Sequence, residues 1–324
     1  MKFSKISLAF ALLLSGQYVA AQNVDTYPSR PVTLVVPSGP AGGTDLMARL
    51  VADRLGKALK QPFIVENKPG ANGILGAENV ARAPNDGYRL LFGYAAGLVV
   101  NPSLYKKLPY DVEKDLAPIA QIGRSGNLLL VNTALPVKTL KEFVDYAKAR
   151  PDQLNYCSWG NGSGGHLSME SLKQQAGLVM THIPFKGSAA CVQDIIGGQV
   201  QAGFGDVSST VELVRAGKVR ALAISGPTRL PNLPDVPTMN EAGFPFTTYA
   251  WYGLMAPAGT PRPIIEKLNA AVRDMLTDPV MVARLRELNL ANLPLTTPEE
   301  FAATIRKDLN DWGALVRSLN LKIE

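Results

Sequence analysis

Cysteine and histidine are scarce in this chain of 324 residues, which contains two of each. Neither His166 nor His182 has cysteine or carboxylate neighbours at the spacing of a metal site, so we expect no bound metal. A strong charge of one sign is also lacking. The formal charge is +6, and the basic residues are scattered along the chain instead of forming a cluster. This distribution argues against binding of nucleic acid.

Long apolar runs are absent beyond the N-terminus. Residues 1–21 combine Lys2 and Lys5, the apolar stretch ISLAFALLLSG and the small residues VAA ending at Ala21, which is the pattern of a secretory signal peptide. The apolar stretch is shorter than the roughly 20 residues that span a bilayer. We therefore expect cleavage near Ala21 and a soluble chain exported to a bacterial periplasm. Loss of the two lysines lowers the formal charge from +6 to +4.

A dinucleotide site would lack one of its parts. Gly160, Gly162 and Gly165 spell G-x-G-x-x-G between the extended run LNYCS and a helical run, the layout that holds a pyrophosphate. That fingerprint also requires an acidic residue about twenty positions on. The next expected strand, VMTHIPFKG, ends instead in Phe185 and Lys186. We therefore expect no cofactor, and a loop whose N–H groups favour some other negative group.

The two cysteines, Cys157 and Cys191, each lie beside an expected junction between a strand and a helix. They could meet at one end of a sheet, and the expected compartment is oxidising. We predict a disulfide between them. Two buried thiols are the alternative, because an even number of cysteines does not by itself decide the pairing.

Extended and helical segments alternate along the chain with short connections, which predicts an α/β protein with mostly parallel sheets. Extended runs near 116–124 and 246–256 bracket a self-contained α/β block. This arrangement predicts two α/β lobes joined by two crossover strands. We expect residues 22–120 and 250–324 to form lobe one, and residues 121–249 to form lobe two. Such a connection permits hinge closure over a ligand.

Five long segments share one resemblance. They read YPSRPVTLVVPSGPAGGTDLMARLVADRL, VENKPGANGILGAENVARAPNDGYRLLFG, NPSLYKKLPYDVEKDLAPIAQIG, HIPFKGSAACVQDIIGGQVQAGFGD and GKVRALAISGPTRLPNLPDVPTMNEAGFP. All are similar to tripartite tricarboxylate transporter substrate-binding proteins, the Bug receptor family, and together they cover essentially the whole mature chain. The resemblance implies a fold like the type II periplasmic binding proteins, a small organic carboxylate as ligand and a cognate membrane permease. It also leads us to expect a monomer.

The resemblance further implies that loops following strands in both lobes bind the ligand. In lobe one these residues are Ser38, Gly42, Gly43, Thr44, Asp45, Tyr94, Ala95 and Ala96. In lobe two they are Ser158, Trp159, Asn161, Gly162, Ser163, His166, Lys186, Gly187, Ser188 and Asp206. SGPAGGTD and GNGSGGH are both glycine turns that enter a helix, so each could direct N–H groups at a carboxylate. We expect the two turns to face each other around the anion.

Several of these residues also have structural interpretations. Asp45 could cap its helix instead of touching an anion, which it would repel. Trp159 and Tyr94 could wall a ligand with a flat or apolar body, or they could pack between loop and sheet. Asp206 could receive an ammonium group or start the next helix. Lys186 could offset ligand charge or be exposed to solvent.

The leading hypothesis is a transport receptor that captures an organic anion between its lobes and delivers it to a permease. An exported enzyme, for example a hydrolase, is the alternative from another class. Its G-x-S-x-G motif fails here, because Asn161 stands two residues before Ser163 where glycine is required. A ligand sensor for a signalling partner would have the same fold as the receptor, so the sequence does not separate the two.

Overall fold

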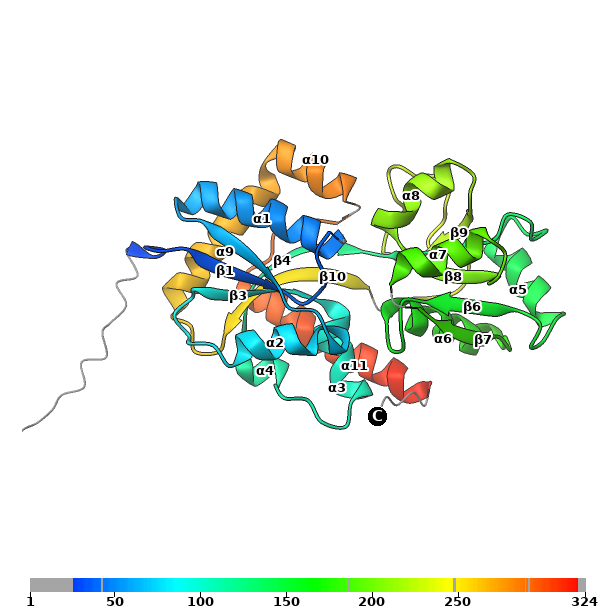
Figure 1. Ribbon diagram of the computed structural model, residues 1–324, viewed down its shortest axis with the longest axis horizontal. Coiled ribbons are helices and arrows are strands. Elements are labelled where there is room, and N and C mark those ends of the chain that lie inside the picture. Colours follow the sequence, from blue (N-terminus) through cyan, green and yellow to red (C-terminus); the bar gives the residue numbers. More distant parts are fainter. Residues whose placement is uncertain are drawn as a thin grey trace, which may run out of the picture.

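The structure is a computed structural model that describes residues 26–41, 43–185, 187–246, 249–288, 290 and 292–319. The predicted signal peptide and its cleavage near Ala21 lie outside these residues, as do the predicted site residues Gly42 and Lys186. Two five-stranded sheets with flanking helices form two bodies that lie side by side (Figure 1). The predicted architecture of two α/β lobes is therefore confirmed.

Lobe one is built on the sheet of order β2-β1-β3-β10-β4. Its strands are β1 (Val32–Val36), β2 (Phe63–Asn67), β3 (Arg89–Tyr94), β4 (Leu116–Ser125) and β10 (Ala250–Pro257). One face packs against α1 (Gly43–Leu59), α9 (Arg262–Thr277) and α10 (Pro279–Glu287). The other packs against α2 (Ile74–Ala81), α3 (Asn101–Leu104), α4 (Val112–Asp115) and α11 (Pro298–Ser318), with short turns η2 (Ala71–Gly73) and η3 (Ala96–Val100). Helices on both faces explain why β1, VTLVV, is almost continuously apolar.

Lobe two is built on the sheet of order β7-β6-β8-β5-β9. Its strands are β5 (Asn127–Val131), β6 (Asn155–Ser158), β7 (Thr181–Pro184), β8 (Ala202–Asp206) and β9 (Arg220–Ile224). Helices α5 (Leu140–Lys148) and α6 (Gly164–Ala176) cover one face, and α7 (Ser188–Ile196) and α8 (Val207–Arg215) cover the other. Lobe two thus has a hydrophobic core on each side of its sheet.

The prediction of mostly parallel sheets is wrong for strands β5 and β10. Strands β1, β2 and β3 pair in parallel, as do β6, β7 and β8. In contrast, β10 runs antiparallel to β3 and β4, and β5 runs antiparallel to β8 and β9. Parallel neighbours need a crossover connection, usually a helix. Strands β5 and β10 enter their sheets directly from the other lobe, without such a helix. They can therefore run antiparallel to their neighbours.

Two chain segments cross between the lobes and are paired with each other. The residues of β4 and β10 pair from Leu116–Pro257 at one end to Ser125–Ala250 at the other. The first crossing is completed at Gly126, where an added Cβ would lie 2.1 Å from the backbone nitrogen of Gly226. Only glycine fits this approach. The lobe boundaries predicted at residues 120 and 250 stay a prediction, and we define the lobes by their sheets.

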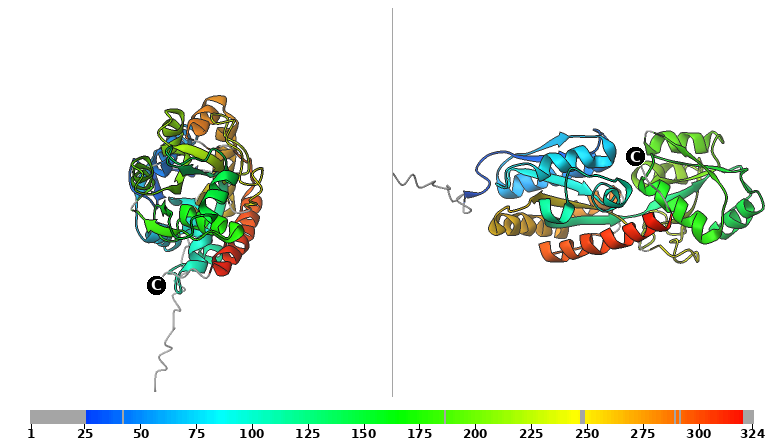
Figure 2. Two further views of the ribbon diagram at one scale, coloured as in Figure 1. Left: turned by 90° about the vertical axis from the view of Figure 1, so that its right-hand side faces the viewer. Right: turned by 90° about the horizontal axis from the view of Figure 1, so that it is seen from below.

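Helix α11 makes a further contact between the lobes. It runs along lobe one toward lobe two, as the view from below shows (Figure 2). At its end, the Gln174 amide of α6 donates to the Ser318 carbonyl at 3.1 Å, and the Ser318 hydroxyl donates to the Gln174 amide oxygen at 3.2 Å. No helix in the described part of the chain is long and apolar enough to cross a bilayer.

Candidate functional site

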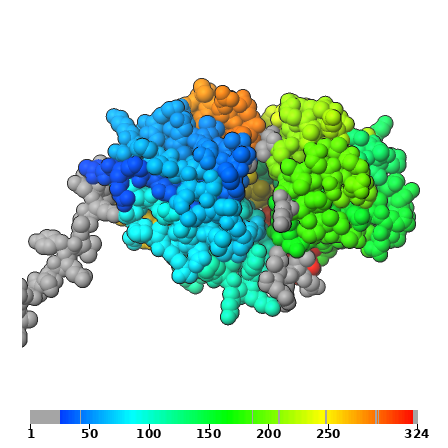
Figure 3. Space-filling view, in the orientation of Figure 1, coloured from blue at the N-terminus to red at the C-terminus, as the bar shows by residue number. Residues whose placement is uncertain are grey.

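A cavity of about 300 Å³ lies between the lobes and is lined by residues of both. The space-filling view shows a hollow between the two lobes (Figure 3). This volume lies at the lower end of the range of small-molecule sites, about 300–1,000 Å³. The residues predicted from the sequence that line it are Ser38, Gly43, Thr44, Tyr94, Ala95, Ala96, Trp159, Ser188 and Asp206. Those described but outside the lining are Asp45, Ser158, Asn161, Gly162, Ser163, His166 and Gly187.

In lobe one, Asp45 lies outside the cavity lining and stabilises the turn before α1 through hydrogen bonds. Its buried carboxylate accepts hydrogen bonds from the Ala41 N–H and the Arg49 guanidinium, each at 2.9 Å, and from the Asn67 amide at 2.8 Å. Burial alone would raise the pKa of this carboxyl, but these donors outweigh burial and lower it. The Asn67 amide also donates to the Ser38 carbonyl at 3.1 Å. With Asp45 fixed behind the turn, Gly43 and Thr44 at the start of α1 line the cavity.

In lobe two, the N–H groups of the glycine loop are largely used within the loop itself. Gly162 N–H donates to Nδ1 of His166 at 3.0 Å, and Ser163 caps α6 by accepting from the His166 N–H at 3.3 Å. Gly160 and Gly162 have φ of +132° and +71°, which favour glycine. These bonds explain why Gly162, Ser163 and His166 lie outside the cavity lining. Asn161 is exposed on the loop.

The third glycine of this motif is needed by a tryptophan. An added Cβ at Gly165 would lie 2.5 Å from Cζ3 of Trp159, so only glycine allows the indole to lie against the first turn of α6. Gly164, which lines the cavity, would place its Cβ 3.5 Å from Cζ2 of the same ring. The glycine pattern that resembles a nucleotide fingerprint therefore serves, in part, to seat Trp159 at the cavity wall.

Behind the loop, His166 and His182 form a stacked pair with ring centroids 4.1 Å apart, and Tyr156 stacks on His182 at 4.8 Å. The Ser158 hydroxyl and Nε2 of His182 lie at hydrogen-bond distance, 2.7 Å. Burial lowers the pKa of His166, and burial together with the neighbouring His166 lowers the pKa of His182 to about 4. Both rings are therefore neutral at neutral pH, as acceptance of the Gly162 N–H by His166 requires.

The Cys157–Cys191 disulfide is present, with an S–S distance of 2.05 Å, which confirms the prediction. It joins the end of β6 to α7, whose first residue, Ser188, lines the cavity. The Ser188 hydroxyl accepts from the Asp206 N–H at 3.2 Å. The Asp206 carboxylate caps α8, accepting from the Ser209 N–H at 3.0 Å and the Ser209 hydroxyl at 2.7 Å.

Sequence reasoning missed part of the lining. The missed residues are Asn72, Asn127, Ser168, Ser225, Ala250, Trp251, Tyr252 and Trp312, whereas Gly164 belongs to the glycine turn that the sequence indicated. Ala250, Trp251 and Tyr252 lie on the second crossing strand, β10, which necessarily passes beneath a site between two lobes. The extended run predicted near residues 246–256 was therefore a usable signal for them. Nothing in the sequence singles out Trp312, which the C-terminal helix α11 contributes.

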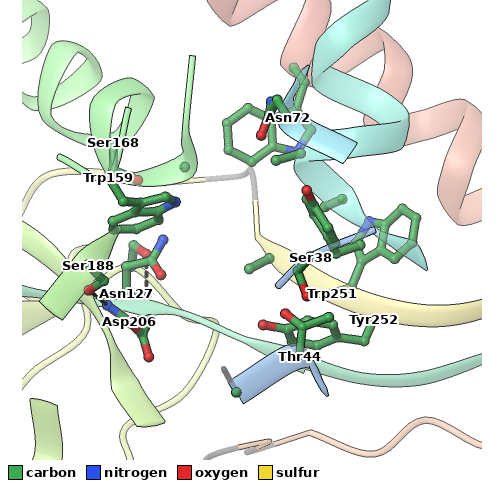
Figure 4. Close-up of a pocket in the computed structure, with 18 residues that line it drawn as sticks. Ser38, Thr44, Asn72, Asn127, Trp159, Ser168, Ser188, Asp206, Trp251 and Tyr252 are labelled. Carbon is green, nitrogen blue, oxygen red and sulfur yellow. Dashed lines mark hydrogen bonds between the residues drawn. The ribbon is translucent and has the colours of Figure 1, made fainter. Parts of the chain in front are cut away.

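The pKa of Tyr252, on β10, depends on residues of both lobes. Burial, together with the negative charge of Asp206 in lobe two, raises the pKa of the Tyr252 hydroxyl to about 12, although Thr44 in lobe one acts to lower it. Figure 4 shows Tyr252 and Thr44 on the lobe-one side, with Asp206 and Ser188 on the lobe-two side. Among the described residues that line the cavity, Asp206 is the only Asp or Glu, and none is Lys, Arg or His.

Comparison with known proteins decides the family. Residues 47–321 match the family described as Tripartite tricarboxylate transporter family receptor. The chain belongs to this receptor family. The earlier resemblance to the Bug receptors is thereby confirmed, and the chain is a solute-binding receptor and not an enzyme.

Three solved structures illustrate the relationship. The periplasmic binding protein BugD is 33% identical, with a TM-score of 0.81 over 92% of this receptor and all of BugD. Rpa4515 of R. palustris, solved with adipate, is 34% identical, with a TM-score of 0.84 over 92% of this receptor and all of its own chain. MatC of Rhodopseudomonas palustris, solved with bound malate, is 37% identical, with a TM-score of 0.79 over 90% of this receptor and all of MatC. Members of this family are periplasmic receptors.

Proposed function

We propose that this receptor captures a small organic carboxylate between its lobes by hinge closure and delivers it to a tripartite tricarboxylate-type membrane transporter. In this proposal the signal peptide is removed near Ala21 and the mature receptor acts as a monomer in the periplasm. Adipate in Rpa4515 and malate in MatC, both dicarboxylates, support a carboxylate as ligand.

One observation carries the proposal: the first residues of three helices, drawn from both lobes, line the same cavity. They are Gly43 of α1, Gly164 of α6 and Ser188 of α7. A helix start presents N–H groups without intrahelical partners and the positive end of the helix dipole. Together the three starts favour a negative group in a cavity whose described lining has no basic side chain.

We also propose ligand contacts for the predicted residues that line the cavity. These are Ser38, Gly43, Thr44, Tyr94, Ala95, Ala96, Trp159, Ser188 and Asp206. Hydroxyl groups of Ser38, Thr44 and Ser188 add donors that do not need a charged side chain. Gly42 and Lys186 stay predictions. Asp45, Ser158 and His166 hold the loops that carry the contacts, through the hydrogen bonds described above.

The test is a thermal-shift screen of the mature chain with mono-, di- and tricarboxylates, followed by calorimetry. A ligand at 100 times its Kd stabilises the folded receptor by about 2.7 kcal/mol. Thr44→Val removes a cavity hydroxyl and should weaken binding, whereas Thr33→Val, on β1 outside the cavity lining, should not. Failure of every carboxylate to bind would contradict the proposal. Uptake by cells with and without the receptor gene separates transport from signalling.

A further inference from the structure

Asn72 lines the cavity from the short turn η2, outside every loop that the sequence predicted to bind the ligand. We propose that its side-chain oxygen accepts a hydrogen bond from the ligand, and that the ligand therefore carries a donor group, a hydroxyl or an ammonium, as well as its carboxylate. The inference rests on the proposed function, since it names the kind of carboxylate that this receptor takes.

The orientation of the Asn72 amide is set by the buried side chain of Asn101. The Asn101 amide nitrogen donates to the carbonyls of Asn72 and Gly97, each at 3.1 Å. Carbonyl oxygens only accept, so the Asn101 amide must turn its nitrogen toward them and its oxygen away. That oxygen accepts from the Asn72 amide nitrogen at 2.8 Å. Asn101 thus fixes which end of the Asn72 amide faces the protein.

The oxygen of the Asn72 amide is left for the cavity. Since the oxygen and nitrogen of an amide lie on opposite sides of its carbon, the oxygen faces away from Asn101, and none of the described residues donates to it. Asn101 is completely buried within lobe one, whereas Asn72 is half-buried at the cavity wall. Figure 4 shows Asn72 on the lobe-one side of the cavity, at the opposite end from Thr44 and the start of α1.

The backbone at Asn72 is held in a conformation that few residues adopt. Ala71 and Asn72 have φ of +46° and +51°, in the left-handed region, where asparagine is enriched among residues other than glycine. Such strain persists only where the surroundings hold it, and it is concentrated at binding and catalytic sites. The Asn101 bond to the Asn72 carbonyl supplies that hold. The acceptor is therefore in place before a ligand arrives, which lowers the cost of ordering it on binding.

The acceptor complements the helix starts in the same cavity. The starts of α1, α6 and α7 at Gly43, Gly164 and Ser188 favour the ligand carboxylate, whereas an amide oxygen attracts a hydroxyl or an ammonium group. A ligand without a donor would displace water from the Asn72 oxygen and leave that oxygen unpaired, which weakens binding. A site with a fixed acceptor therefore selects against the analogue that lacks the donor.

The experiment measures Kd by calorimetry on the mature receptor for carboxylates that differ in the donor. Succinate, malate and aspartate share one carbon skeleton and carry hydrogen, hydroxyl and ammonium at the same carbon, and tricarballylate and citrate differ by one hydroxyl. We expect the preferred donor to tighten binding within a series, by about 2- to 12-fold for a hydroxyl, the contribution of one neutral hydrogen bond. The order of malate and aspartate identifies that donor. Equal or weaker binding of every donor-bearing ligand would overturn the inference, as would binding of adipate more tightly than all of them.

Two variants link the preference to Asn72. Asn72→Gly removes the amide and suits the left-handed backbone, and Asn72→Ala removes it with the residue that its neighbour Ala71 already is. In both, the ligands of a series should bind equally. The control Lys60→Gly changes an exposed left-handed position outside the cavity lining and should keep the preference.

The ratio of two Kd values in one variant separates a lost contact from a general loss of stability, which weakens both ligands alike. A preference that survives in Asn72→Gly and Asn72→Ala would overturn the assignment to Asn72. If carboxylates bind without regard to a donor, only the inference fails. If no carboxylate of any kind binds, the proposed function fails with it.

Discussion

Removal of the disulfide should destabilise the receptor by an amount that follows from its place in the chain. The bridge closes a loop between Cys157 and Cys191, which are 34 positions apart. In the chain-entropy treatment a loop of this length corresponds to about 3.8 kcal/mol at 25 °C. The two sulfur atoms pack closely against Gly203, where an added Cβ would lie 2.9 Å and 3.3 Å from them. Replacement of both cysteines by alanine removes these atoms and leaves a small void, which further lowers the stability.

The assay is equilibrium unfolding in urea, followed by far-UV circular dichroism. With a slope of about 2 kcal/mol per molar urea, a loss of 3.8 kcal/mol moves the midpoint down by about 2 M. The matched control is the natural sequence equilibrated with a reducing agent, so that the bridge is broken in both the folded and the unfolded state and two thiols of nearly the same size remain in the core. Its midpoint should fall by close to the entropic part. An unchanged midpoint, with both thiols shown by mass spectrometry to be reduced in the unfolded chain, would refute the entropic explanation.

The remaining predictions concern the loops around the cavity. The pKa of His182 falls from its ordinary value near 6.5 to about 4 on folding, so the neutral ring contributes stability above pH 6.5 that is lost as pH falls toward 4. Urea midpoints measured across this window should therefore decline, and His182→Gln should flatten the decline. Gly165→Ala overpacks the Trp159 ring and should cost about 1–3 kcal/mol, with a shift in indole fluorescence as the check. Asp45→Ala leaves the Ala41 N–H and other donors unpaired and should cost about 1–3 kcal/mol, while Asp53→Ala, an exposed residue of the same helix, should cost under about 1 kcal/mol.

Sequence patterns could predict the lobes because each depends on local signals. Apolar runs such as Val32–Val36 mark buried strands, and turns such as the one before Gly43 mark the entry to a helix. The disulfide was also within reach, because strand-to-helix junctions gather at one edge of a sheet. The direction of β5 and β10 was not, since it depends on how the chain passes between lobes and not on any local pattern.

The glycine loop shows where sequence reasoning stops. Its spacing correctly marks a turn that enters α6, but the partner of the Gly162 N–H depends on where the helix places His166. Similarly, the need for glycine at position 165 becomes visible only when the Trp159 ring lies on it. A pattern of small residues therefore predicts a close approach without telling whether the neighbour is a ligand or the protein itself.

The pairing of β4 with β10 limits the way in which the lobes can move. Two separate linkers would let one lobe swivel about the other, whereas a ribbon bonded as far as Ser125–Ala250 resists shear between its edges. Such a ribbon bends most easily about an axis that lies across its flat face, perpendicular to the strands, so the lobes at its two ends should open and close by that bending. Gly126 lies at the end of the first crossing against the backbone of Gly226 in lobe two, and a side chain there would force the two segments apart.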